Sequence, residues 1–501
     1  MNRSKSTFKK LLSLLMCAIF VLSTVSVLAS CNKGDDGITS QAGDTEEAKP
    51  DIPEVTEANF GGYEFNVLIC SRSSRTPNDF EVKEGQADTA MGSAVYTRYL
   101  RMLEKYNVNI VCNAQLGGDE RKNEAFVTME TQYNSQTNDY DFCVINTYAV
   151  APITTAGYLY DMNSVPYLDL TKSWWDQTML DDLTISGSVY FMSGDITTTV
   201  DDYMYCTIFN KKLYDQYITD GTDVYELVNK KDWTLDKLKT LSSMLKDGDV
   251  DGDDIMTNAD RYGLMTWYDE MFASVQASGG RIAKVNENGY MELTLQSERN
   301  FAVMNKYMEL ENLPTTINFQ NETINPGKRF VSIFSENRAM FFMTILNEVY
   351  RFRDQDVDYG ILPNPMYNDE QEDWFCTFSA GLASFTCIPG YQQNIERTGI
   401  IVELLGWEAV ETIKPGYYDH TLNGKLVSDN ESIDSLTIIL DNKFVDIGHY
   451  FTVGSLNQVM HSVASSGSAA SFMSEYATYR DQAISDVNRI NSEFDALKTR
   501  N

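Results

Sequence analysis

The stretch from residue 140 to residue 163, YDFCVINTYAVAPITTAGYLYDMN, decides the fold class. It opens with a short apolar run at residues 142–145, which is typical of a strand buried on both faces of a parallel sheet. Strand-like and helical periodicities alternate in the segments before it: 63–70, 95–106, 108–112 and 123–133. Together these segments predict a β-α-β-α-β lobe.

The residues directly after the apolar run are the first candidates for a binding site. Open α/β sheets bind ligands beyond the carboxyl ends of their strands. Asn146, Thr147 and Tyr148 follow the predicted strand. We therefore expect these three residues to contact ligand.

A second lobe begins where the pattern restarts, near residue 190. Residues 203–209 predict a strand, and Thr234 is a plausible N-cap for the helical face that follows it. Further elements are expected at 291–295, 298–311, 339–346 and 358–362, and the carboxyl third is mainly helical. The fold class is therefore α/β, with two lobes, hinge crossovers and a helical C-terminal region.

We divide the chain into a leader, a tether and two discontinuous lobes. The parts are a lipoprotein signal peptide (1–30), a flexible tether (31–59), lobe 1 (60–160 and roughly 335–425), and lobe 2 with the C-terminal helices (roughly 161–334 and 426–501). Two crossings between the lobes are expected. The tether is rich in Gly, Asp, Glu, Ser and Thr, so burial of apolar groups cannot offset its ordering entropy.

The first thirty residues predict export. Four basic residues precede an apolar stretch at 11–29, which is the order of a secretory signal. The stretch ends in Leu28, Ala29, Ser30 and Cys31, which resembles the bacterial lipobox. Cys31 would then carry the lipid. A plain transmembrane helix is the alternative, since nineteen residues could just span a bilayer.

Charge and composition exclude several classes of function. The net charge is −32, and removal of the leader makes it −36 because the leader holds four basic residues and no acid. Such a surface repels nucleic acid and anionic membranes. The three histidines, His420, His449 and His461, are too scattered for the usual imidazole-built zinc or iron site.

Six cysteines remain beyond the leader and Cys31. Four of them lie in apolar runs and are expected to be buried thiols: Cys70, Cys112, Cys143 and Cys206. Cys376 and Cys387 could bridge two neighbouring strands in an oxidising compartment.

An acidic loop at residues 247–260 is a candidate calcium site. It holds six carboxylates within fourteen positions, and alternate carboxylates in a tight loop can wrap a hard cation. One register begins at Asp247 and places Gly252 at the turn, but it ends on Asn258. The favoured register uses Asp249, Asp251, Asp253 and Asp260, and it places Asp254 where glycine is preferred. A solvated loop without metal is the alternative.

Aromatic residues beside acids suggest a sugar ligand. Flat rings cover the apolar faces of sugars, and carboxylates accept hydrogen bonds from hydroxyl groups. The clusters are Trp174–Trp175–Asp176, Trp267–Tyr268–Asp269–Glu270, Asp373–Trp374 and Tyr417–Tyr418–Asp419. The ligand-contact candidates taken from them are Trp267, Tyr268, Asp269, Glu270 and Trp374. Core packing is the alternative for each ring.

Catalytic motifs for acyl transfer, zinc proteolysis and phosphate binding are absent from the sequence. The acidic dyads Asp181–Asp182 and Asp201–Asp202 could supply a glycosidase pair. Such dyads occur in nearly every acidic protein. We therefore expect no catalytic residues and no enzyme.

The chain resembles the type 1 extracellular solute-binding proteins, lipid-anchored receptors of ATP-driven carbohydrate importers. The resemblance rests on the lipobox and residues 140–163, on SVYFMSGDI at 188–196, and on DWTLDKLKTL followed by the acidic loop and RYGL. RAMFF, VDYGILPNP and residues 417–448 add to it. The family's usual Gly and Trp after the Ala-Met-Phe strand are replaced by Met343, Thr344 and Ile345.

This resemblance implies a function and its partners. Two lobes would close over a sugar or oligosaccharide, with Asp195 in the crossover segment as a further ligand contact and structural calcium as the one cofactor, found in some members. The receptor would be a monomer on the extracellular face of the membrane and would deliver its ligand to an ABC permease. The rivals are a peptide or polyamine receptor and a lipid-anchored glycoside hydrolase.

Overall fold

The computed structural model describes residues 51–71, 79–82, 89–117, 123–418, 427 and 429–498. The predicted signal peptide, Cys31 and most of the predicted tether lie outside these residues. Contacts of the folded body begin earlier than expected, because Asp51, inside the predicted tether, pairs with Lys172 at 3.0 Å. Among the described residues, none of the helices is both long and apolar enough to cross a membrane.

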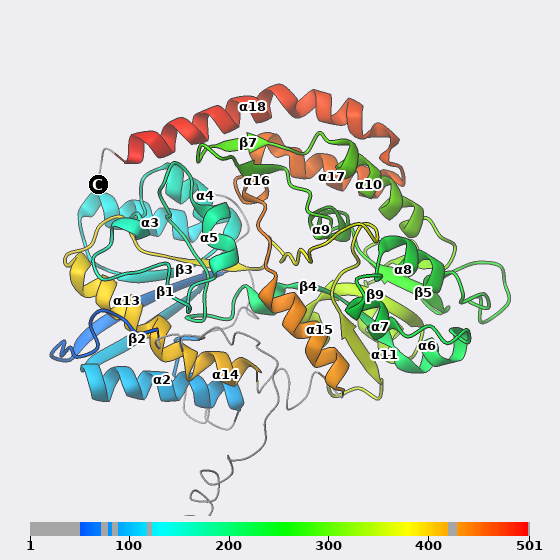
Figure 1. Ribbon diagram of the computed structural model, residues 1–501, viewed down its shortest axis with the longest axis horizontal. Helices are drawn as coiled ribbons and strands as arrows, with labels where there is room; N and C mark the ends of the chain where they lie inside the picture. Colours follow the sequence, from blue (N-terminus) through cyan, green and yellow to red (C-terminus); the bar gives the residue numbers. More distant parts are fainter. Residues whose placement is uncertain are drawn as a thin grey trace, which may run out of the picture. The chain divides into compact units, whose positions relative to one another are not determined.

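The first sheet is the lobe predicted from residues 63–145. Its strand order is β11-β3-β1-β2, and β1 (Tyr63–Ser71), β2 (Val108–Leu116) and β3 (Phe142–Asn146) are parallel (Figure 1). The connecting helices are α2 (Ala90–Tyr106) and α3 (Glu124–Ser135). The caps explain where they begin: the side chains of Thr89 and Asn123 accept hydrogen bonds from backbone N–H groups of the first turns. The β-α-β-α-β prediction is confirmed.

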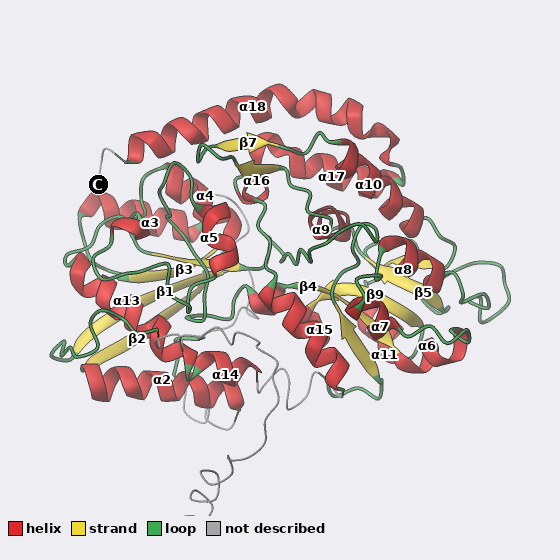
Figure 2. Cartoon of the chain, in the orientation of Figure 1, coloured by secondary structure: helices red, strands yellow, loops and turns green. Residues whose placement is uncertain are grey.

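The second sheet has the order β10-β4-β9-β5-β8. Its strands are β4 (Tyr205–Asn210), β5 (Tyr262–Thr266), β8 (Thr316–Asn318), β9 (Ala339–Ile345) and β10 (Tyr359–Leu362). Strand β4 runs antiparallel to β9 and β10, whereas β5 is parallel to β8 and β9. Figure 2 shows these strands as a group separate from the first sheet.

The predicted start of the second part of lobe 1, near residue 335, is wrong for two strands. β9 and β10 pair within the second sheet, and only β11 (Ser384–Cys387) returns to the first sheet, antiparallel to β3. A buried apolar run predicts a strand but carries no information about which sheet it joins.

Helices surround the second sheet: α6 (Lys211–Tyr217), α7 (Val224–Asn229), α8 (Leu235–Ser242), α9 (Glu270–Ala277), α10 (Glu298–Glu311), α11 (Phe330–Ser335) and α12 (Leu346–Val349). The bounds of α10 match the prediction. The Thr234 side chain caps α8 by accepting from the Lys237 N–H. The predicted strand near residue 291 exists as β7 (Met291–Leu293), but it pairs with β6 (Ala283–Val285) in a separate ribbon.

The carboxyl third is helical, as predicted. α13 (Ile395–Val410) and α14 (Ile413–Tyr418) pack on α2 of the first lobe, whereas α15 (Asn430–Asp441) packs on β10. The chain therefore crosses between the lobes three times, the number that the predicted lobe boundaries near residues 160, 335 and 425 imply, and not the two crossings expected. α16 (Ile447–Tyr450) and α17 (Leu456–Ser466) precede α18 (Phe472–Leu497), which contacts both α4 (Thr147–Thr155) and β7 (Figure 1).

Two of the crossings lie side by side. Met204, just before β4, forms a β-bridge with Phe378, and the Tyr205 N–H donates to the Thr377 carbonyl at 2.9 Å. This pairing joins the chain entering the second lobe to the chain leaving it. The carboxyl ends of β3 and β5 are the edges from which a ligand site would be built.

Candidate functional site

The residues at the carboxyl end of β3 have two different roles. Asn146 and Thr147 are fully buried, and their side chains donate to the carbonyls of Gly381, Ala383 and Ala380. They fasten the segment that returns to β11. Tyr148 is half-buried in the first turn of α4, and its hydroxyl lies 2.9 Å from Nε2 of His449. Of the three predicted contacts at this edge, only Tyr148 presents part of its side chain to solvent.

Trp267 occupies the equivalent place in the second lobe, directly after β5. Its half-buried ring stacks on Phe319 with the ring centroids 5.8 Å apart and the planes at 21°. Tyr205 packs against it at 6.1 Å. The indole Nε1 donates to Oε1 of Glu270 at 2.9 Å. These contacts fix the plane of the ring.

Glu270 positions Trp267. The side chain is fully buried, and its second oxygen accepts from Nδ2 of Asn364 at 2.9 Å. Asn364 in turn accepts from the Thr207 hydroxyl at 2.9 Å. Both carboxylate oxygens of Glu270 are thus used inside the protein. The prediction that Glu270 accepts from a ligand is replaced by a positioning role, which burial alone reveals.

The buried Glu270 gives the free energy of unfolding a specific pH dependence. Burial raises its pKa to about 8, against the effect of the hydrogen bonds from Trp267 and Asn364. Because the folded state then holds this proton more tightly than the unfolded state, the contribution favours folding at low pH and is lost as pH rises toward 8. We expect Glu270→Gln to flatten the decline in stability between pH 5 and pH 8. Urea unfolding across that range measures it, and an unchanged slope would contradict the assignment.

Two histidines complete this region. His449 stacks on Phe272 with centroids 4.9 Å apart, and His461 meets the same ring edge-on at 4.7 Å. Nε2 of His461 lies 3.7 Å from a carboxylate oxygen of Asp269. Burial lowers the pKa of His449 to about 3, so its ring is neutral. The two lobes are therefore joined here by aromatic contacts and a neutral imidazole.

We call this region the interlobe cluster, formed by Tyr148, Tyr205, Trp267, Asp269, Phe272, His449 and His461. Tyr148, Trp267 and Asp269 were predicted from the sequence. The others come from elements far apart in the chain, and no local pattern marks them. Tyr268 is half-buried beside the cluster, and its N–H donates to Gln320 at 2.9 Å. Trp374 is buried in the core.

Asp195 lies elsewhere, in a cavity of about 250 Å³. The cavity is lined by Trp175, Asp176, Asp195, Lys414, Tyr417 and Lys443, among others. Asp195 pairs with Lys414 at 3.1 Å, and Lys443 pairs with Asp176 and Asp201 at 2.9 and 2.7 Å. Burial raises the pKa of Asp195 to about 6 despite Lys414. These charges are already paired with one another, which does not suit a neutral sugar.

The two tryptophans beside this cavity belong to the core. Trp174 and Trp175 are 1 % and 2 % exposed, and both indoles donate to Glu403. Of the acidic dyads, Asp182 pairs with Arg281 at 2.6 Å, and Asp202 accepts from Asn347 and Tyr350. These carboxylates maintain structure.

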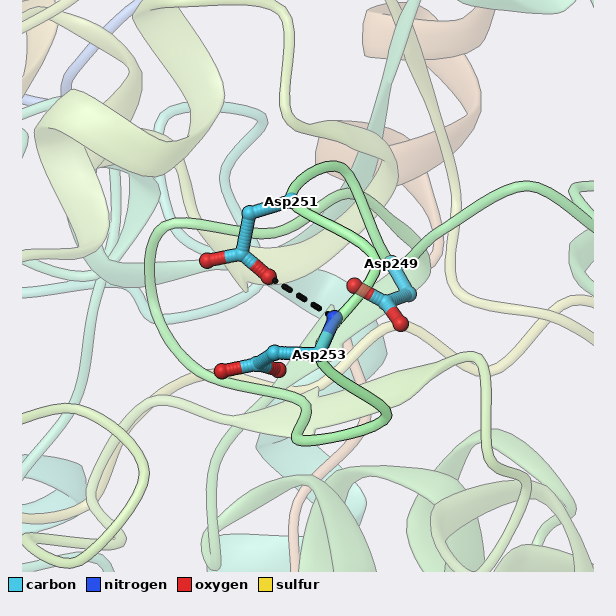
Figure 3. Close-up of side chains that lie close together, drawn as sticks. All are labelled: Asp249, Asp251 and Asp253. Atoms are coloured by element: carbon cyan, nitrogen blue, oxygen red, sulfur yellow. Dashed lines mark hydrogen bonds between the residues drawn. The ribbon is translucent and has the colours of Figure 1, made fainter.

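The acidic loop brings three of its four predicted ligands together. One carboxylate oxygen each from Asp249, Asp251 and Asp253 lie within 4.8 Å of one another (Figure 3). Asp260 has another role: it is buried and accepts from the N–H groups of Val250 and Thr257. Asp254 adopts a left-handed φ of 60°, so it takes the conformation for which glycine is preferred. The donor set of three hard oxygens fits calcium.

No protein-family model and no curated protein matches the chain. Several solved structures match the chain. An ABC substrate-binding protein from Listeria monocytogenes in complex with cycloalternan has a TM-score of 0.52 at 14 % identity, covering 86 % of this chain and 99 % of that one. MalX from Streptococcus pneumoniae in complex with maltopentaose gives 0.52 at 14 %, covering 85 % and 99 %.

A cyclic alpha-maltosyl-1,6-maltose binding protein from Arthrobacter globiformis has a TM-score of 0.51 at 12 % identity, covering 88 % of this chain and all of that one. The chain thus has the two-lobe fold of the sugar-binding ABC substrate-binding proteins. This confirms the expected fold class and, at the level of the fold, the resemblance to extracellular solute-binding proteins.

Proposed function

We propose that this protein is a non-catalytic receptor that binds a neutral oligosaccharide at the interlobe cluster. The observation that carries the proposal is Trp267, a half-buried ring whose plane is fixed by Phe319 and Glu270 at the carboxyl end of β5. Tyr148 lies at the carboxyl end of β3 in the other lobe. Rigid aromatic faces with Asp269 nearby suit a ligand that offers both C–H faces and hydroxyl groups.

The comparisons support an oligosaccharide over the other ligand classes. The similar structures contain cycloalternan and maltopentaose, or are described as binding a cyclic maltose derivative. Micromolar affinity corresponds to roughly −8 kcal/mol, which two aromatic platforms and several hydrogen bonds can supply. We further propose that the receptor is a monomer and delivers its ligand to an ABC permease at the extracellular face of the membrane.

A thermal-shift screen tests the proposal. The panel contains linear maltodextrins, cyclic glucans, other oligosaccharides, peptides and polyamines. A ligand at 100 times its Kd adds about 2.7 kcal/mol to the free energy of unfolding, so the correct class raises the melting temperature clearly. A rise in melting temperature with peptides or polyamines, and no rise with any glycan, would overturn the sugar assignment. Release of smaller sugars from a responding oligosaccharide would instead identify a glycoside hydrolase.

Lipid anchoring at Cys31 is part of the proposal. We expect Cys31→Ser to leave the chain unprocessed or to release it from the membrane, because lipid acyl chains such as palmitate add about 0.8 kcal/mol per buried methylene. Membrane fractionation and intact mass measure this. Cys17→Ser, within the apolar leader, is the matched control and should leave both unchanged. Parent-like mass and retention in Cys31→Ser would exclude lipidation.

We also propose that Asp249, Asp251 and Asp253 hold a structural calcium ion. Chelator should then lower the melting temperature of the parent, and Asp251→Asn should abolish that response because one charged oxygen is lost. Asp254→Asn is the control: Asp254 lies in the same loop outside the cluster, and Asn tolerates its left-handed conformation. Identical melting curves of the parent in calcium and in chelator would contradict the site.

A further inference from the structure

Two cysteines of the first sheet lie directly opposite each other. The antiparallel register of β11 on β3 pairs Cys387 with Cys143, and both residues are fully buried. Burial and the neighbouring Cys387 thiol raise the pKa of the Cys143 thiol, and the Cys143 sulfur lies 3.9 Å from the Met129 sulfur. Both cysteines are free thiols in this structure.

The backbone geometry at this pair suits a covalent bond. The Thr147 N–H donates to the Ala383 carbonyl at 3.2 Å, so these two directly opposed residues form a hydrogen-bonded pair. In an antiparallel ladder every second pair of opposed residues is of this kind. Cys143 and Cys387 fall on the hydrogen-bonded set, where the Cα atoms are about 5.5 Å apart. Disulfides span Cα distances of about 4.4–6.8 Å. Directly paired residues also point to the same face of a sheet, so the two side chains are neighbours on one face.

The cross-strand partner differs from the one expected from the sequence. Cys376 was the predicted partner of Cys387, but it lies outside β11. Its backbone forms an isolated β-bridge with Lys443, and its sulfur lies 3.8 Å from the Ile438 carbonyl oxygen. Cys70, on the neighbouring strand β1, pairs with Ile145 rather than with a cysteine.

We propose that Cys143 and Cys387 form a disulfide when the chain folds in an oxidising compartment. The oxidant is a small or protein disulfide, such as oxidised glutathione. One cysteine thiolate attacks it and forms a mixed disulfide with release of one thiol, and the second cysteine then displaces the other. The two protein thiols lose two protons and two electrons in total, and the oxidant's disulfide becomes two thiols.

The bond must form during folding. The thiolate is the attacking species, and burial raises the pKa of Cys143 well above its usual range. No oxidant reaches a sulfur that is fully buried. Once the sheet is complete, a chain that folded with two thiols therefore keeps them, and a chain that folded with the disulfide keeps the disulfide. The bond would tie β3 to the strand that returns from the second lobe.

Refolding of the full chain tests the proposal independently of sugar binding. The purified chain is unfolded in denaturant with reductant, refolded in a glutathione redox buffer, alkylated and mapped by peptide mass spectrometry. We expect one cross-linked peptide pair, containing Cys143 and Cys387. As a control, the folded, reduced chain is placed in the same buffer without unfolding and is then denatured and alkylated. Both cysteines should be alkylated in this control.

Variants separate the bond from general effects on folding. Cys143→Ala and Cys387→Ala should each abolish the cross-link, whereas Cys70→Ser should retain it. The oxidised parent should melt about 5 °C or more above the reduced parent, and the alanine variants should show no such difference. Complete alkylation of both cysteines after oxidative refolding, or a link between Cys387 and Cys376, would overturn the proposal.

Discussion

Lys443→Met is expected to lower the free energy of unfolding by about 3–5 kcal/mol, because it leaves two carboxylates that are only 16 % and 22 % exposed without their charged partner. The Lys443 side chain is 9 % exposed, and its amine lies 2.9 Å from Asp176 and 2.7 Å from Asp201. Burial disfavours the charged amine, but the two carboxylates more than offset this and raise its pKa above the usual range. The lysine therefore stays charged and holds the start of α5 (Gln177–Leu183) against the crossover segment before β4.

The cavity supplies a matched control. Lys414 pairs with Asp195 at 3.1 Å, but its side chain is 44 % exposed, so Lys414→Met should cost less than about 1 kcal/mol. Urea unfolding at pH 7 measures both variants. The deficit of Lys443→Met should shrink as pH falls, because burial raises the pKa of Asp201 and its protonation removes an unpaired negative charge. Equal losses for the two variants would contradict the assignment.

The sequence predicts such a network poorly, although it predicts the elements well. The run at residues 142–145 and the spacing at 298–311 predict β3 and α10, because burial and periodicity are local properties. Lys443, Asp176 and Asp201 come from separate parts of the chain, and no periodicity links them. The same reason explains why β9 was assigned to the wrong lobe.

The candidate site shows the same division. The cluster of aromatic and acidic residues at 267–270 could be predicted, because the residue types alone suit a sugar. The sequence could not predict which of the two acids, Asp269 or Glu270, points into the core. Glu270 is fully buried under Trp267, whereas Asp269, one residue earlier, is half-buried beside His461. The contribution of His449 depends on the packing of α16 on α4, which brings together residues about 300 positions apart.

Trp267→Ala should weaken oligosaccharide binding by about 2 kcal/mol or more, which is roughly 30-fold in Kd. A rigid aromatic ring at the centre of a binding surface typically contributes on this scale. Because the ring is only half-buried, the variant should still fold, with a smaller loss than the 3–5 kcal/mol of a core tryptophan. Trp267→Phe, which keeps an aromatic face, should bind with intermediate affinity.

Trp407 provides the matched control for this substitution. It is also half-buried, but it lies on α13 of the first lobe, where the Lys105 amine sits 4.6 Å from its ring. Trp407→Ala removes a comparable aromatic surface from α13, a helix that contains none of the residues of the interlobe cluster. It should lose some stability and retain parent-like binding.

Calorimetric titration of the parent, Trp267→Ala and Trp407→Ala tests the central claim most directly. The titrant is the oligosaccharide that raises the parent's melting temperature most in the thermal-shift screen. We predict saturable binding to the parent and to Trp407→Ala with similar Kd, and at least about 30-fold weaker binding to a folded Trp267→Ala. Equal binding to the parent and to Trp267→Ala, or no heat with any oligosaccharide, would contradict a sugar site at the interlobe cluster.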